Sequence, residues 1–329
     1  MDTSYFSIVK NKILIISTSG YFNTGQEAIV LQIISEIKTS KKRDKIAVIS
    51  HSPNESEIEN SVKYFRPLSL AMLKEFIFSN IIIIAGDEIT SSRFDKLYPN
   101  FFSYFQGKFK TFIAFIAVLF GKKVVFYKIG LYSFQKNYPK KLLLFALEKS
   151  KQVIVRDAET KKNLESLGLK REIVVMKDPG YDLQYKKQKK KKSIGLALSD
   201  PLDIEKENQL IEFIRKLIFI KKNYKFLFFI FGQHPKLKSE NDQFFTKRVI
   251  SKLDTNFRYK IFDEKNPIKV KSKVSSMSFF ITTRYHGGVF ADSTGVPFIA
   301  IPVSGKLRTF GRRTIEFSAL EKVNLNNIK

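Results

Sequence analysis

The sequence predicts an α/β protein built from two Rossmann-like, doubly wound domains that face a cleft. Short continuous runs of Ile, Val and Phe alternate with helical patterns along the chain, which is typical of strands buried on both faces of a parallel sheet. At 329 residues the chain is long enough for two domains. A Lys-rich run at 186–192 separates two halves of the same α/β pattern.

The first half, residues 1–185, contains six expected strands separated by helices. Each strand is a short apolar run rich in β-branched residues. The runs are Ile13–Ser17, Ile46–Ile49, Ile81–Ala85, Val124–Tyr127, Val153–Val155 and Ile173–Val175. Between the first two, the segment Ala28–Ile37 places isoleucines on one stripe and therefore predicts an amphipathic helix.

The longest apolar run, Phe112–Phe120, predicts a buried helix that ends at a cap formed by Gly121. It is far shorter than the roughly 20 residues that a helix needs to span a bilayer. The N-terminus does not have the pattern of a secretory signal, in which a basic start precedes an apolar stretch and a small-residue cleavage site. We therefore expect a cytoplasmic protein that can associate peripherally with the inner face of the membrane.

The second half begins after the Lys-rich run, which we interpret as an exposed linker because like charges repel one another. Residues 193–329 contain four further expected strands: Ile194–Leu198, Phe226–Phe231, Phe279–Thr282 and Phe298–Ile301. The stretch from 306 to 329 predicts a terminal helix with a polar tail that packs back on the first domain. In sheets of this kind, ligands bind beyond the carboxyl ends of the strands.

The composition carries a net charge of +27, from 58 Lys+Arg against 31 Asp+Glu. Most of these cations are lysines spread over the chain, as expected for solvated faces under A/T-rich codon usage. Proteins that recognise nucleic acid favour arginine, and this sequence contains no nucleic-acid recognition motif. We therefore expect no nucleic-acid partner.

The absence of cysteine excludes disulfides, thiolate zinc sites and a cysteine nucleophile. No spacing of His and carboxylate residues suggests a metal site.

Two loops of the first half follow expected strands and carry polar residues. The loop 19–27 contains Asn23 and two glycines ahead of a helix, and free N–H groups at a helix start favour an anion, although a plain turn has the same pattern. The sequence Gly86-Asp87-Glu88 offers two acids for proton transfer or hydroxyl binding, or for capping a helix.

A third polar loop of the first half begins with Arg156 and Asp157. An arginine at a strand end is well placed to clamp a carboxylate or phosphate with two hydrogen bonds. A surface ion pair between these two residues is the alternative interpretation.

The most informative motif is Arg284-Tyr285-His286-Gly287-Gly288 in the second half. A strand delivers a cation and an imidazole to its carboxyl end, and a helix then begins at the two glycines. This combination suits an anionic substrate that needs proton transfer. Lys306 and His234 also follow expected strands; His234 favours a structural role, and Lys306 could add a cation at the cleft.

Taken together, these motifs resemble the polysaccharide pyruvyl transferase family over nearly the whole chain. The resemblance rests on segments in a matching order and spacing: Gly20 to Glu27, Val155-Arg156-Asp157, Asp178-Pro179, Arg284 to Gly287, and Gly295-Val296-Pro297. It implies a GT-B-like fold of two Rossmann-like domains, and transfer of the pyruvyl group of phosphoenolpyruvate to a sugar, with no cofactor. The chain departs from the family pattern at Gln26, Asp87, Leu131 and Tyr285.

The resemblance also implies roles for the candidate residues. His286 would be the general acid, and Glu27, Asp87 and Glu88 are candidates for the base. The implied donor-binding residues are Arg156, Arg284, Lys306, Gly287 and Gly288. The expected acceptor-binding residues are Asn23, Gly25 and Glu88.

The expected partners are phosphoenolpyruvate, a glycan or lipid-linked sugar acceptor, and an anionic membrane surface. The alternative function is a nucleotide-sugar-dependent glycosyltransferase on the same fold. That activity would need contacts to a base and a ribose, for which the sequence has no signature.

Overall fold

The computed structural model describes residues 11–40, 44–53, 62–86, 88–89, 101–132, 138–234, 238–253 and 256–327. The predicted site residue Asp87 lies outside the described residues. The chain forms two compact units, of which unit 1 contains Met1–Gly20 and Ile29–Pro179. Unit 2 contains Tyr21–Ala28 and Gly180–Lys329, so a short segment from the first half of the sequence groups with the second unit.

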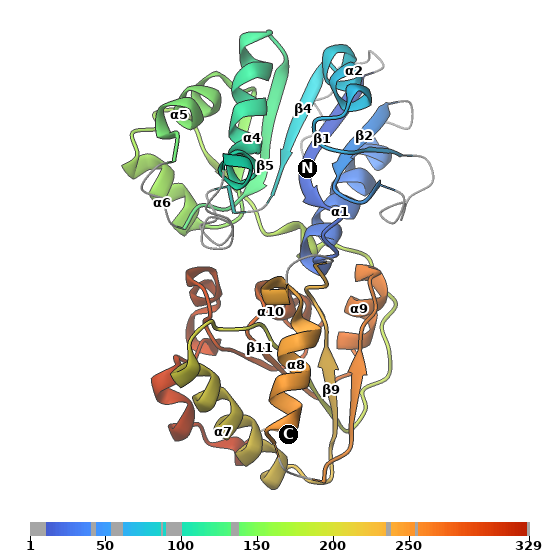
Figure 1. Cartoon of the computed structure of the whole chain (residues 1–329), viewed down its shortest axis with the longest axis vertical. Coiled ribbons are helices and arrows are strands. Elements are labelled where there is room, and N and C mark those ends of the chain that lie inside the picture. The colour runs from blue at the N-terminus through green and yellow to red at the C-terminus, as the bar shows by residue number, and fades with distance from the viewer. Residues whose placement is uncertain are drawn as a thin grey trace. The chain divides into compact units, whose positions relative to one another are not determined.

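Unit 1 is built around a parallel sheet of seven strands in the order β3-β2-β1-β4-β5-β6-β7 (Figure 1). Its strands are β1 (Lys12–Ser19), β2 (Lys45–Ser50), β3 (Lys63–Phe65), β4 (Ile81–Ala85), β5 (Lys123–Ile129), β6 (Gln152–Val155) and β7 (Val174–Val175). Its helices are α1 (Thr24–Ser40, whose first turn groups with unit 2), α2 (Leu70–Phe78), α4 (Phe101–Leu119), α5 (Lys140–Lys149) and α6 (Ala158–Ser166).

Helices cover both faces of this sheet. On one face, α1 buries Ile29 and Ile33 against Ile15 of β1 and its neighbours. On the opposite face, α2, α4 and α5 contribute to a second buried cluster that contains Phe76 and Ala117. Burial of the sheet on both sides explains why its strands read as continuous apolar runs instead of alternating patterns.

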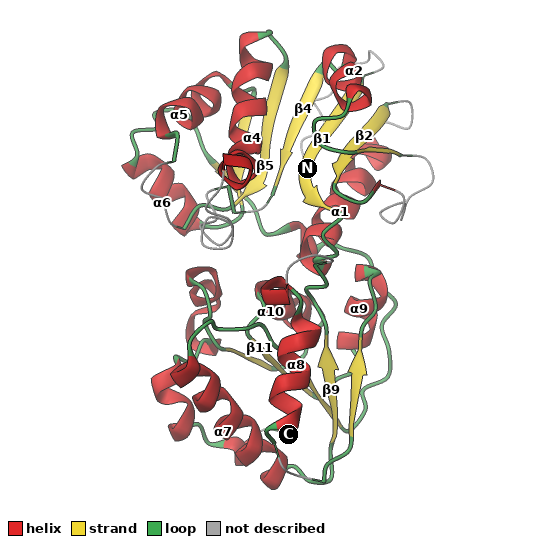
Figure 2. Cartoon of the chain, viewed as in Figure 1, coloured by secondary structure: helices red, strands yellow, loops and turns green. Residues whose placement is uncertain are grey.

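Unit 2 contains a parallel sheet of five strands in the order β10-β9-β8-β11-β12. Its strands are β8 (Ser193–Ala197), β9 (Lys225–Phe229), β10 (Tyr259–Phe262), β11 (Phe279–Thr282) and β12 (Phe298–Ala300). Its helices are α7 (Ile204–Ile220), α8 (Asp242–Ser251), α9 (Pro267–Val274) and α10 (Tyr285–Ser293), as Figure 2 shows. Short 3-10 helices complete the chain: η3 (Pro179–Tyr181), η4 (Lys238–Glu240), η5 (Gly305–Arg313), η6 (Phe317–Lys322) and η7 (Leu325–Asn327).

The Lys-rich segment 186–192 runs beside the end of α9 in unit 2. The backbone N–H groups of Lys186 and Gln188 donate to the hydroxyls of Ser272 and Ser275, at 3.1 Å and 3.0 Å. The compact units divide earlier, between Pro179 and Gly180. The backbone of this segment is therefore attached to unit 2, while the assignment of 186–192 as the domain linker stays a prediction.

Within the described part of the stretch 306–329, the expected terminal helix does not form. Residues 305–327 form three 3-10 helices instead, and η6 and η7 bury Phe317, Leu320 and Leu325 in the core of unit 2. Gly311 has a φ of 59°, which interrupts any continuous helix there. Elsewhere the expected helix end at Gly121 is confirmed, since this residue has a φ of 68° and lies two residues after Leu119, the last residue of α4.

None of the helices in the described ranges combines the length and the apolar character that a membrane crossing requires.

Candidate functional site

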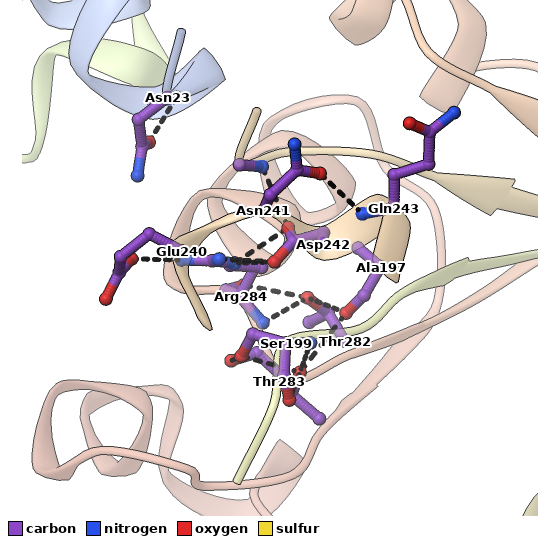
Figure 3. Close-up of polar contacts among 12 residues, drawn as sticks. Asn23, Ala197, Ser199, Glu240, Asn241, Asp242, Gln243, Thr282, Thr283 and Arg284 are labelled. Carbon is purple, nitrogen blue, oxygen red and sulfur yellow. Dashed lines mark hydrogen bonds and ion pairs between the residues drawn. The ribbon is translucent and has the colours of Figure 1, made fainter. Parts of the chain in front are cut away.

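The carboxyl ends of β8 and β11 lie side by side at the centre of the sheet of unit 2, where the strand order reverses. This is the position at which open α/β sheets bind ligands. The two strand ends are held together by polar contacts: the N–H of Ser199 donates to Oγ1 of Thr283 at 2.6 Å, and the two hydroxyls are 3.1 Å apart (Figure 3). The residue after Thr283 is Arg284, which begins α10.

Thr282 holds the backbone of Arg284 in place from within the strand. Its Oγ1 accepts the N–H of Arg284 at 2.9 Å and donates to the carbonyl of Arg284 at 2.7 Å. Arg284 occupies the N-cap position of α10 in an extended conformation. The guanidinium is therefore delivered at a defined point beyond the sheet.

Asp242, the first residue of α8, binds the guanidinium of Arg284. Its two carboxylate oxygens lie 2.9 Å and 3.1 Å from Nε, and Nη2 also donates to this carboxylate. The same carboxylate accepts the N–H of Gly232 at 2.8 Å. Nη1 of Arg284 points toward Glu240, at 4.0 Å (Figure 3). Arg284 is thus held by two acids that were not identified from the sequence.

These acids determine the electrostatics of the arginine. Burial acts to lower the pKa of Arg284, but the charge and hydrogen bonds of Asp242, with a contribution from Glu240, outweigh it and raise the pKa. The guanidinium stays charged inside a largely buried cluster. Two of its nitrogens are engaged by Asp242, and the third, Nη1, faces Glu240.

The segment Tyr21–Ala28 packs onto the same region of unit 2. The N–H of Thr24 donates to the carbonyl of Phe231 at 2.8 Å, and the N–H of Gln233 donates to Phe22 at 3.2 Å. The ring of Tyr21 stacks on the imidazole of His234, with centroids 4.5 Å apart. The loop that follows β1 is therefore joined to the loop that follows β9.

Asn23 caps the start of α1 within this segment. Its Oδ1 accepts the N–H of Gly25 at 3.1 Å, and its carbonyl accepts the N–H of Glu27 at 3.0 Å. Glu27 is buried in the first turn. The predicted residues Asn23, Gly25 and Glu27 thus share one helix start in unit 2, although the sequence suggested that they belong to the first domain.

His286 lies directly against this helix start. A Cβ atom placed on Gly25 would lie 1.8 Å from Nδ1 of His286, so the imidazole occupies the space that any other residue at position 25 would need. The ring also contacts Tyr285 edge to face, at 5.2 Å between centroids. The structure therefore brings together the two motifs that contain Gly25 and His286.

Gly287 and Gly288 are both buried in the first turns of α10. A Cβ on Gly287 would lie 2.3 Å from Oγ1 of Thr282, and one on Gly288 would lie 2.6 Å from the ring of Phe310. The two glycines thus allow α10 to pack closely against β11 and η5. Lys306, half-buried, is the second residue of η5 after β12.

Unit 1 holds a separate cluster around the buried Arg156. Its Nε donates to the hydroxyl of Tyr132 at 2.9 Å, and its guanidinium lies 3.7 Å from Asp178 and 3.8 Å from Asp157. Burial raises the pKa of Tyr132, with Arg156 acting to lower it and Asp157 to raise it. Arg156 therefore forms the ion pair with Asp157 that the alternative interpretation of the sequence expected. The arginine of this pair is buried and not at the surface.

Glu88 lies in unit 1, next to a residue that Arg156 contacts. It forms a parallel bridge with Gly130, and a Cβ on Gly130 would lie 2.6 Å from Nη2 of Arg156. In the ranges that the structure describes, no group of three or more His, Cys, Asp or Glu residues has an arrangement able to hold a metal ion.

Several solved structures share the fold of the chain. UDP-GlcNAc 2-epimerase from Methanocaldococcus jannaschii matches with a TM-score of 0.57 and 14% identity, over 97% of this chain and 94% of that chain. UDP-GlcNAc 2-epimerase from Neisseria meningitidis, bound to UDP-GlcNAc, matches with a TM-score of 0.55 and 11% identity, over 97% and 94%. At these identities the match shows the fold alone, which is a GT-B-like fold with two Rossmann-like domains.

An α-glucosyltransferase in complex with UDP and a DNA 13-mer matches with a TM-score of 0.50 and 10% identity, over 93% of this chain and 82% of that chain. No curated protein matches the sequence. The sequence model of the polysaccharide pyruvyl transferase family matches residues 23–305. This range contains both the helix start at Asn23 and the motif from Arg284 to Gly288, and it covers most of the chain. The chain belongs to the polysaccharide pyruvyl transferase family.

Proposed function

We propose that this protein transfers the pyruvyl group of phosphoenolpyruvate to a sugar of a cell-surface polysaccharide or of a lipid-linked glycan, forming a cyclic ketal and releasing phosphate. Membership of a transferase family supports this activity. The observation that carries the proposal is the contact of His286 with the first turn of α1, beside the carboxyl end of β11. An imidazole, a guanidinium and two helix starts belong to unit 2.

The donor-binding part of the proposal rests on charge. Phosphoenolpyruvate is a small molecule with a phosphate and a carboxylate, and backbone N–H groups at helix starts favour such anions. The start of α10, with Arg284 at its N-cap, belongs to this region, whereas the N–H groups of Thr24 and Gly25 at the start of α1 already donate to Phe231 and Asn23. Asp242 orients the guanidinium of Arg284, and we propose that this guanidinium adds positive charge near the donor. We propose Lys306 as a further cation for it.

The chemistry requires a proton and a base. In the proposed reaction, His286 gives a proton to the methylene carbon of phosphoenolpyruvate, which becomes a methyl group. The adjacent carbon becomes electrophilic, and a sugar hydroxyl attacks it while its proton passes to a base. Phosphate then leaves with the electrons of its C–O bond, and a second hydroxyl closes the ketal by bonding to the same carbon while its proton passes to the departing phosphate. General acid–base catalysis of this kind contributes about 10²–10⁴-fold to a rate.

Glu27 is the candidate base within the same region, because it lies in the helix turn that contacts His286. Glu88 and Arg156 belong to unit 1, where their contacts are to Gly130 and to nearby acids. We keep Glu88 as an acceptor-binding residue of the proposal and Arg156 as a donor-binding residue.

Thermal unfolding of the purified chain with phosphoenolpyruvate, and separately with a panel of nucleotide sugars, tests the donor. A ligand that binds only the folded state raises the unfolding temperature with its concentration. We expect a rise with phosphoenolpyruvate and none with nucleotide sugars. A rise with a nucleotide sugar alone would overturn the proposal in favour of a glycosyltransferase.

A further inference from the structure

Unit 1 exposes a group of large apolar side chains on α2 and at the end of α4. Leu70 is 86% exposed and Phe120 is 75% exposed. We name this group the α2–α4 surface, and its members are Leu70, Leu73, Ile77, Phe78, Leu119 and Phe120. Isolated exposed apolar residues are ordinary, but a contiguous group marks an interaction site.

Helix α2 carries apolar side chains on two sides, one that faces the core and one that faces away from the core. Met72 and Phe76, one turn apart, are buried. Leu70, Leu73 and Ile77 are exposed, and their spacing places them on one outer stripe of the helix, away from Met72 and Phe76. A helix that only covers a sheet would carry polar residues on this outer stripe. Core packing therefore does not explain why the outer stripe of α2 is apolar.

The end of α4 adjoins the end of α2. The ammonium group of Lys122 donates to the carbonyls of Ile77 and Ser79, at 2.9 Å and 2.7 Å, and lies 5.2 Å from the ring centroid of Phe76. Leu119 and Phe120 directly precede this turn of the chain. The two helices also contribute to the same buried cluster on one face of the sheet, and Lys122 joins the turn after α4 to the end of α2.

Lysines surround this apolar surface. Lys12 and Lys45 lie opposite each other at the first position of β1 and β2, and Lys123 begins β5 at the same edge of the sheet. All three are exposed, and the ammonium group of Lys12 lies 4.9 Å from the ring centroid of Phe78. Lys74 adds an exposed charge on α2 itself.

Two acids lie near these lysines among the described residues. Glu75 of α2 is half-buried, and Asp44 accepts hydrogen bonds from the backbone and the side chain of Asn11. The exposed charges that accompany the apolar side chains of α2 and of the end of α4 are thus mainly positive.

We propose that the α2–α4 surface docks this protein on an anionic lipid bilayer. Leucine and phenylalanine side chains that protrude between lysines are the pattern by which helices bind in the plane of a membrane interface. Lysine stems can lie along the apolar region while their ammonium groups reach the phosphates of the headgroups. The lysines complement an anionic leaflet, and their attraction adds to the burial of apolar area.

The charges also argue against the binding of a second copy of the chain at the α2–α4 surface. In a two-fold dimer, each surface meets its own copy. Lys12, Lys74 and Lys123 would then lie close to the same lysines of the other copy, within a protein that already carries a net charge of +27. An anionic bilayer satisfies both the apolar and the cationic parts of the surface.

Vesicle flotation of the full chain tests the proposal. The vesicles contain either phosphatidylcholine alone or phosphatidylcholine and phosphatidylglycerol in equal amounts. We expect the protein to float with the anionic vesicles only, and the double variant Leu73→Gln/Ile77→Gln to bind roughly tenfold more weakly because less apolar area is buried. Lys74→Glu should also weaken binding, and the effect of this charge reversal should shrink at high salt.

The matched controls lie on unit 2. Ile204 and Phe219 are 79% and 83% exposed, so Ile204→Gln/Phe219→Gln removes similar exposed apolar groups elsewhere, and Lys216→Glu on α7 reverses an equally exposed charge. These variants should bind anionic vesicles as the natural sequence does. Thermal unfolding of each variant shows that it folds.

Two results would overturn the proposal. One is equal binding of anionic vesicles by the natural sequence and by Leu73→Gln/Ile77→Gln, or no binding by either. The other is a dimer in light scattering that this double variant converts to a monomer, which would assign the surface to a second copy. None of these measurements uses phosphoenolpyruvate, so they are independent of the proposed reaction.

Discussion

Gly25 and His286 lie in direct contact although they are far apart in the sequence. A Cβ atom on Gly25 would come within 1.8 Å of Nδ1 and 2.2 Å of Cγ of the imidazole. Because Gly25 is part of a regular helix, its backbone conformation suits any residue, and the imidazole alone makes glycine necessary. The identity of residue 25 therefore depends on the position of His286.

We predict that Gly25→Ala displaces the imidazole of His286 and destabilises the fold by about 1–3 kcal/mol, the usual cost of an additional methyl group in a packed site. Urea unfolding measures the free-energy change. NMR of the imidazole nitrogens follows the ring, because the chain contains only three histidines. Gly305→Ala is the control, since a Cβ there meets nothing within 4 Å. Unchanged imidazole signals in Gly25→Ala would contradict the contact.

The buried pair of Arg284 and Asp242 gives a second prediction. Asp242→Ala leaves a buried guanidinium without its main counter-charge, so we expect a loss of about 3–5 kcal/mol in the free energy of unfolding. The exposed pair of Arg215 and Glu212 is the control, where Glu212→Ala should cost about 0–1 kcal/mol. If both variants lost the same small amount, the buried pair would not stabilise the fold.

A third prediction concerns the proposed general acid. His286→Ala should abolish phosphate release from phosphoenolpyruvate and acceptor, while the rise in unfolding temperature with phosphoenolpyruvate is largely retained. His51→Ala is the control, because His51 lies in the loop after β2 in unit 1. Phosphate release at the natural rate by His286→Ala would remove this residue from the mechanism.

A fourth prediction concerns pH. Burial acts to raise the pKa of Glu207, but hydrogen bonds from Lys252 and Arg248, with their charges, outweigh it and lower the pKa. The unfolded chain therefore takes up the proton more readily than the folded protein. The stabilisation is present above the unfolded pKa of about 4.3 and is lost as the pH falls through the folded pKa.

Glu207→Gln should therefore reduce the free energy of unfolding near neutral pH, and the difference from the natural sequence should shrink below about pH 4. Urea unfolding over a series of pH values measures this difference. Glu212→Gln, which removes an exposed carboxylate from the same helix, is measured over the same pH series as the control. A constant difference at all pH values for Glu207→Gln would contradict the lowered pKa.

The strands show how much of the fold can be read from the sequence. Every strand expected from an apolar run is present, because burial on both faces of a parallel sheet requires such runs. The strands β3 and β10 were not predicted. Both lie at sheet edges and are only partly buried, so lysine and tyrosine replace the continuous apolar pattern.

The site was predictable only in part. The motif that contains Arg284 and His286 was identified because both residues follow a strand at its carboxyl end. Asp242 and Glu240 were not identified, since they lie in a polar loop with no pattern of their own. A buried arginine needs a counter-charge, but the sequence does not show which of its acids supplies it.

The sequence by itself determined the α/β class, the positions of most strands along the chain and the family. These depend on local runs of apolar residues and on the spacing of motifs. The tertiary structure decided which segments meet. It grouped Tyr21–Ala28 with unit 2, set His286 against Gly25 and paired Arg284 with Asp242. These contacts join residues that are distant along the chain, so only the packed structure defines them.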